Sequence, residues 1–168
     1  MSAMPSDAYR HRVNGLAVVS SAAFFGCNLF IGLSLGSYWM SLEPLEFARE
    51  FWGQFTVFLY TVMPLFLLTL VGLVLSTRLD RPDPSARRTW QLAIGLYVAT
   101  TVITLAVHVP ENLRLRDPSY TAFEADAARR YWLLWHSPRV LLSLGIPILA
   151  LRAIRARGAG TIRSHEGH

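Results

Sequence analysis

The sequence contains no lysine and one cysteine, and charged side chains are nearly absent from four long stretches. All 16 basic residues are arginines, and the formal net charge is +5. A single cysteine, Cys27, excludes an internal disulfide and a cysteine-based metal motif. The arginines flank apolar stretches instead of forming the basic face of a soluble domain. This pattern therefore argues against a nucleic-acid partner.

The four uncharged stretches are long enough to cross a bilayer. Hydrophobic residues make up 52% of the 168 residues, and about 20 apolar residues cross a hydrocarbon core of about 30 Å. The sequence predicts an all-α, four-helix membrane bundle at 13–151, between an N-terminal tail (1–12) and a basic, disordered tail (152–168). The predicted spans are residues 13–38, 51–76, 90–109 and 131–151.

Local features refine this prediction. The third span is rich in valine and threonine, which favour a strand in water, but a lone strand is not viable in lipid and a helix is expected. Pro64 is expected to kink the second span and Pro138 the fourth. Residues 41–51 have helical spacing and are predicted to form a separate segment that lies in the membrane interface.

The arginines predict an orientation. Those near both termini and in the 77–89 loop fall on one side, whereas those in the other two connections are mixed with acids. Basic residues favour the cytoplasmic side, so both termini are predicted to be cytoplasmic in a multi-pass protein of the plasma or inner membrane. Trp39, Trp52, Trp132 and Trp135 are then expected at the outer interface, and Trp90 at the inner one.

Polar side chains gather near the outer ends of the spans, where ionisable residues are rare and usually functional. Arg139 is the strongest signal, about two helical turns inside its apolar stretch. It is predicted to pair with Glu46 or Glu50, or alternatively to extend to the outer headgroups. The polar group consists of Asn28, Glu46, Glu50, Gln54, His108, Asn112, His136 and Arg139.

Two histidines of this group, His108 and His136, are predicted at matching heights on neighbouring spans. They could form an acid–base pair, bind a metal or hold a haem. Glu46 and Glu50 share a helix face and could add carboxylate ligands. No tight ligand motif links these residues, so two histidines bonded to backbone or lipid are the alternative.

Aromatic residues surround the same predicted region. They could line a pocket for a flat lipophilic molecule or form an interfacial belt. The group consists of Phe51, Trp52, Phe55, Tyr60, Trp132 and Trp135.

Three motifs, within about 15–151, carry a resemblance to a known family. The first is Pro-Leu-Glu-Phe-Ala-Arg-Glu-Phe-Trp at 44–52, followed by Met-Pro at 63–64. The second is Pro-x-Asn at 110–112, and the third is Trp132, Trp135 and Arg139. The pattern resembles small four-span membrane proteins related to anthrone oxygenases.

The resemblance implies oxidation of a polycyclic phenolic anthrone by dioxygen without an added cofactor. It also implies that Asn112, Trp135 and Arg139 are site residues. His136 departs from the pattern, which often has another polar residue there.

The leading hypothesis is a membrane oxygenase or related oxidoreductase that acts on a lipophilic aromatic, anthrone- or quinone-like substrate in an outer-leaflet pocket. A histidine or Glu50 would remove a proton, and Arg139 and Asn112 would stabilise the oxyanion. The expected substrate contacts are Asn28, Glu46, Gln54, Trp132 and Trp135.

Two alternatives have no catalytic role. The protein could bind a lipid or a protein partner, or it could be a metal- or haem-binding membrane subunit that uses His108 and His136. Either form could be a homo-oligomer.

Overall fold

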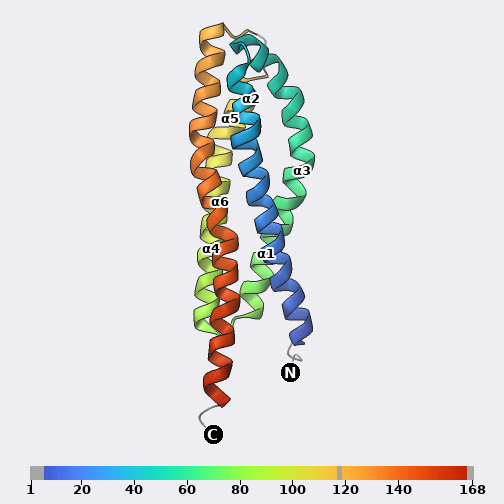
Figure 1. The fold of residues 1–168 in the computed structure, drawn as a ribbon, viewed down its shortest axis with the longest axis vertical. Coiled ribbons are helices and arrows are strands. Elements are labelled where there is room, and N and C mark those ends of the chain that lie inside the picture. The colour runs from blue at the N-terminus through green and yellow to red at the C-terminus, as the bar shows by residue number, and fades with distance from the viewer. Residues whose placement is uncertain (1–5, 117–118, 166–168) are drawn as a thin grey trace.

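The structure is a computed structural model that describes residues 6–116 and 119–165, with side chains as far as residue 156. Four long helical rods lie side by side in an elongated bundle, and both ends of the chain lie at the same end of it (Figure 1). The described residues contain no β-strand. The predicted all-α, four-helix architecture is confirmed.

Each predicted span lies inside a longer helical rod. The first rod consists of α1 (Asp7–Phe30), a π-helical turn η1 (Ile31–Leu35) and α2 (Gly36–Ser41). The second is α3 (Pro44–Leu79). The third consists of α4 (Pro84–Ile103), a π-helical turn η2 (Thr104–His108) and α5 (Val109–Arg114), and the fourth is α6 (Ala122–His165).

Two local predictions are wrong. Residues 44–51 are the first turns of α3 and not a separate segment, because Pro44 at the start of a helix is compatible with its continuation. α6 continues past Leu151 to His165, so the C-terminal tail begins as helix.

The helices continue through their internal prolines, Pro64 in α3 and Pro138 in α6. Membrane helices tolerate proline when neighbouring groups satisfy the freed backbone. A kink at either proline stays a prediction.

Side-chain caps explain where two of the helices begin. The Asp83 carboxylate accepts hydrogen bonds from the backbone N–H groups of Ser85 and Ala86 at the start of α4. Before α6, the Thr121 backbone N–H donates to Glu124, and the Glu124 N–H donates back to the Thr121 hydroxyl. This reciprocal pair is a capping box, which satisfies donors that a helix start leaves unpaired.

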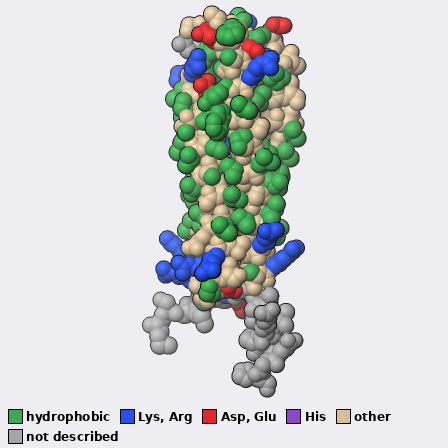
Figure 2. All heavy atoms as spheres, turned by 90° about the vertical axis from the view of Figure 1, so that its left-hand side faces the viewer, with side chains coloured by type: hydrophobic (Ala, Val, Ile, Leu, Met, Phe, Trp, Pro, Cys, Tyr) green, Lys and Arg blue, Asp and Glu red, His purple; other side chains and the backbone are tan. Residues whose placement is uncertain are grey.

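The outer surface of the bundle is apolar over most of its length. Figure 2 shows hydrophobic side chains along the middle of one face and arginines near both ends. Each rod contains a stretch apolar and long enough to cross a membrane. The molecule is therefore a multi-pass membrane protein.

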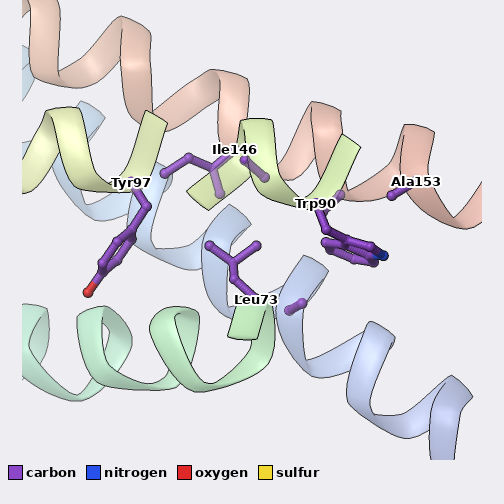
Figure 3. Close-up of a cluster of buried hydrophobic side chains, with 8 residues drawn as sticks. Leu73, Trp90, Tyr97, Ile146 and Ala153 are labelled. Carbon is purple, nitrogen blue, oxygen red and sulfur yellow. The ribbon is translucent and has the colours of Figure 1, made fainter. Parts of the chain in front are cut away.

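A core cluster fills the half of the bundle near the termini (Figure 3). Trp90, expected at a membrane interface, is fully buried here, and its indole N–H donates to Asp80 Oδ2 at 2.8 Å. The Arg10 guanidinium lies 3.6 Å from the other Asp80 oxygen and ties α1 to the end of α3. The cluster consists of Ala17, Leu73, Trp90, Ala93, Tyr97, Ile146, Ala150 and Ala153.

Gly72 allows α1 and α3 to approach closely. A Cβ at this position would lie 2.7 Å from the Ala17 Cα and 2.9 Å from its backbone nitrogen, so the helices would have to separate. We expect Gly72→Ala to lower the free energy of unfolding by about 1–3 kcal/mol, the usual range for overpacking. Thermal unfolding in detergent measures this.

The matched control for Gly72 is Gly95→Ala. Gly95 is exposed on α4, and a Cβ there meets nothing within 4 Å. Because alanine is the better helix former, this variant should be neutral or stabilised by up to about 1 kcal/mol. Equal destabilisation by the two substitutions would contradict the close approach at Gly72.

Candidate active site

A cavity of about 270 Å³ lies in the half of the bundle away from the termini, where α2 and α5 are found (Figure 1). All four rods contribute to its wall, which is largely aromatic and aliphatic. Its strongly polar lining residues are His108, Asn112 and Arg139. The remaining lining residues are Phe24, Ile31, Trp39, Phe51, Phe55, Phe58, Leu59, Val62, Met63, Phe66, Thr101, Thr104, Leu105, Val109 and Trp132.

Two π-helical turns border this region. η1 begins three residues after Asn28, and η2 ends at His108. A π-helical turn changes the direction in which the following side chains point and often occurs at functional sites. Here the Asn28 carbonyl receives a hydrogen bond from His136, and His108 is only 1% exposed.

Arg139 is buried without a carboxylate partner among the described residues. Its side chain donates to Asn28 Oδ1 at 3.1 Å and to His136 Nδ1 at 3.4 Å, and its Nε has no hydrogen-bond partner. Within the part of the chain that the structure describes, none of the ion pairs at 4.0 Å or less involves Arg139. The predicted ion pair with Glu46 or Glu50 is therefore wrong. At 8% exposure, Arg139 does not extend to the surface either.

The acidic residues near the start of α3 have other surroundings. Glu50 accepts hydrogen bonds from the Tyr38 hydroxyl at 2.8 Å and from Gln54 Nε2 at 3.0 Å. Gln54 Oε1 in turn accepts from the Trp39 indole at 2.7 Å. Glu46 is exposed. Glu46, Glu50 and Gln54 do not line the cavity, although Gln54 orients the Trp39 ring that does.

His108 presents an unpaired nitrogen. Its Nδ1 lies 3.5 Å from the Ile103 carbonyl, at the limit of a hydrogen bond. Its Nε2 is buried without a hydrogen-bond partner among the described residues. A neutral imidazole with a free lone pair beside a cavity is suited to remove a proton from a bound molecule.

His136 lies behind the cavity wall. Its Nε2 donates to the Asn28 carbonyl at 2.9 Å, and its Nδ1 accepts from Arg139, so both nitrogens are occupied. Trp132 stacks on the His136 ring at 4.9 Å and contacts the His108 ring edge-on at 4.7 Å. The two histidines thus converge, with ring centroids 5.8 Å apart, but only His108 lines the cavity.

Asn112 completes the polar part of the cavity. Its Oδ1 accepts the indole N–H of Trp132 at 2.8 Å. Because the oxygen is engaged, the side-chain NH₂ group is the part of Asn112 that can donate to a bound molecule. Trp132 therefore fixes the direction in which Asn112 offers its donors.

The tryptophans agree only in part with their predicted positions. Trp39, expected at the interface, is 1% exposed and lies in the core around the cavity. Trp132, expected either at the interface or as a substrate contact, is 5% exposed and lines the cavity. Trp135 is 37% exposed, packs against Tyr131 and does not line the cavity. Sequence reasoning missed Trp39, Thr101 and Thr104 as cavity residues. Trp39 was assigned to the interface, and threonines in an apolar helix give no distinctive signal.

The described residues contain no group of three or more histidine, cysteine or acidic side chains placed to hold a metal ion. Of the two histidines, His136 has no free nitrogen in this arrangement, so only His108 offers one.

Comparison with known proteins gives one family. Residues 52–148 match the family model described as anthrone oxygenase, which is more than half of the chain and includes most of the cavity residues. No match was found to a curated protein or to a solved structure.

Proposed function

Because the chain belongs to the anthrone oxygenase family, we propose that it oxidises a polycyclic phenolic substrate of the anthrone type with dioxygen inside the apolar cavity. The observation that carries this proposal is the buried Arg139 guanidinium, which lines the cavity and has no carboxylate partner among the described residues.

A buried positive charge without a counter-ion is costly in a membrane protein. An anionic substrate would supply the missing negative charge. In the apolar cavity, away from water, its attraction to the Arg139 guanidinium would be little screened. The Asn112 amide adds a neutral donor to the lining of the same cavity. Donors placed in advance where a negative charge develops are the main source of catalysis in many enzymes.

His108 is the proposed base. Its unpaired Nε2 would remove a proton from the acidic methylene group of the anthrone, and the resulting enolate would be stabilised by Arg139 and Asn112. The electron-rich enolate is itself the reductant of dioxygen. One oxygen atom enters the substrate, whose CH₂ group becomes C=O, and the other leaves as water.

The aromatic wall has a separate role in this proposal. Phe51, Phe55 and Phe58 on α3 line the cavity, whose polar residues come from the third and fourth rods. Aromatic faces suit a flat polycyclic ring, and an apolar wall excludes water from the reacting anion. A ligand of this shape fits the general pattern of apolar pockets with a few placed polar groups.

The direct test is dioxygen uptake by purified protein supplied with an anthrone. We expect His108→Phe to lower the rate about 10²–10⁴-fold, which is the usual contribution of a general base. His11→Phe is the matched control, because His11 is exposed near the N-terminus and far from the cavity. Wild-type uptake no faster than the uncatalysed reaction would contradict the proposal and favour a non-catalytic binding protein.

We propose that no resident cofactor takes part. A visible haem band, or stoichiometric iron, copper or zinc in the purified protein, would replace this mechanism with one in which His108 is a ligand.

The orientation is also a proposal. Arginines with few acidic neighbours lie at the end of the bundle that holds both termini, so this end is proposed to face the cytoplasm. Reporter fusions at Asp83 and Ser119 should read inside and outside, respectively. The opposite readings would place the cavity in the cytoplasmic leaflet.

A further inference from the structure

Four aliphatic residues both line the cavity and face outward. Leu59 and Met63 on α3 are 42% and 41% exposed, and Leu105 on η2 and Val109 on α5 are 62% and 38% exposed. Side chains that contact the cavity and the outside at once mark its mouth. The mouth therefore lies between the second and third rods.

This mouth faces lipid. Leu59 lies nine residues beyond Glu50, the nearest charged residue on α3, which is about 13 Å along a helix. Its neighbour Tyr60 is 84% exposed on the apolar surface. Val109, in contrast, lies only two residues from Glu111. The opening thus extends from the polar end of the third rod into the hydrocarbon region.

The two routes along the bundle axis are closed by packed aromatic rings. Toward the polar end, Trp39, Phe47 and Phe51 are 0–1% exposed and pack with centroids 5.2–5.9 Å apart. Toward the termini, the Phe66 ring stacks on Tyr97 with the ring centroids 4.8 Å apart, and Tyr97 belongs to the core cluster shown in Figure 3. A molecule arriving from water along the bundle axis meets one of these two layers.

We propose that the substrate enters sideways from the bilayer and is an amphiphile, with an ionisable aromatic head and a hydrocarbon tail that stays in lipid. This rests on the proposed function, since the head is the group that Arg139 and Asn112 bind. The four exposed residues of the mouth are all aliphatic. A hydrocarbon tail that lies across them therefore displaces no water from a polar side chain. The polar residues lie on the cavity wall, and the aliphatic ones at its mouth.

The probes are a brominated naphthol and the same naphthol with a dodecyl chain, added to protein in lipid nanodiscs. Bromine quenches tryptophan fluorescence on contact, and Trp39 and Trp132 line the cavity. The saturable part of the quenching reports binding and does not depend on turnover. We expect the wild type to bind both probes, and the tailed one at least as tightly at equal concentration in the membrane.

Leu105→Trp should obstruct the mouth. We expect it to weaken binding of the tailed naphthol at least about tenfold and that of the tailless one less, because a clash at the rim discriminates against the tail. Val98→Trp is the control, since Val98 is 49% exposed two turns away on α4 and does not line the cavity. It should leave both affinities unchanged.

The outcomes separate the two proposals. Binding of the tailless probe without the tailed one would overturn the lateral entry of a tailed substrate and leave the proposed function standing. Equal weakening of the tailed probe by Leu105→Trp and Val98→Trp would overturn the location of the mouth. Failure of the wild type to bind either naphthol would overturn both the inference and the proposed function.

Discussion

Replacing Arg139 with methionine is expected to lower the rate of substrate oxidation sharply while leaving the protein as stable as the wild type, or more stable. A charged residue within a membrane helix costs about 2.5–3.5 kcal/mol, whereas interhelical hydrogen bonds in membranes contribute about 0.6 kcal/mol each. Arg139 makes one such bond, to Asn28 on α1, and a second hydrogen bond within α6, to His136. The cost of the uncompensated charge exceeds their contribution, so its removal should raise stability.

The activity should change in the opposite direction. Loss of an oxyanion-stabilising donor lowers the rate about 10²–10³-fold. Dioxygen uptake and thermal unfolding in detergent, measured on the same preparation, give both quantities. Arg116→Met is the control, because Arg116 is exposed and lies outside the cavity. A clear loss of stability in Arg139→Met would reveal a compensating charge and remove the basis of the proposed anion site.

Replacing Arg129 with alanine is expected to destabilise the protein, by about 1–3 kcal/mol for each backbone carbonyl that loses its donor. Arg129 is 4% exposed and donates to the Trp39 carbonyl at 2.6 Å and to the Leu42 carbonyl at 2.8 Å. It also pairs with Asp126. Its loss would leave the Trp39 and Leu42 carbonyls at the end of α2 without hydrogen-bond donors. It would also remove one of the two arginines that contact the Asp126 carboxylate.

Arg130→Ala is the matched control for Arg129. Arg130 contacts the other oxygen of the same Asp126 carboxylate at 2.8 Å, but its side chain is 65% exposed. Exposed ion pairs contribute at most about 1 kcal/mol, so the loss of stability should be small. Thermal unfolding that shifts equally in the two variants would contradict the assigned role of Arg129.

The transmembrane architecture could be predicted because it depends on quantities that a sequence states directly. Long apolar stretches and arginine-rich connections identify four spans whatever their side chains contact. The depth of the polar residues followed from the same reasoning. His108, Asn112, His136 and Arg139 come from two rods and do lie close to one another, as their common depth predicted.

The partners of these residues could not be predicted, because both faces of a membrane helix are apolar and the pattern does not show which face points inward. Glu50 was predicted at the depth of Arg139, but its side chain contacts Tyr38 and Gln54 instead. The π-helical turns add to this difficulty. η2 ends at His108 and η1 follows Asn28, and each changes the helical register near the site.

The burial of Trp39 was missed for a related reason. Tryptophan near the end of a membrane span favours the interface on average, which predicted an interfacial position for Trp39 and left Trp132 either at the interface or in a pocket. Each instead has a hydrogen-bond acceptor inside the bundle, Gln54 for Trp39 and Asn112 for Trp132. The acceptors lie 15 and 20 residues away in the sequence, on other helices, so the pairing depends on the tertiary structure.

The central claim is that Arg139 holds an anion in an apolar cavity, and the ionisation state of a bound ligand tests it most directly. The probe is a hydroxyanthraquinone, which cannot be oxidised as an anthrone is and whose visible absorption shifts when its phenol ionises. At a pH where the free molecule is neutral, the wild type should bind it with the spectrum of the phenolate, and Arg139→Met should not. A bound ligand with the neutral spectrum in the wild type, or the same phenolate spectrum in Arg139→Met, would contradict the claim.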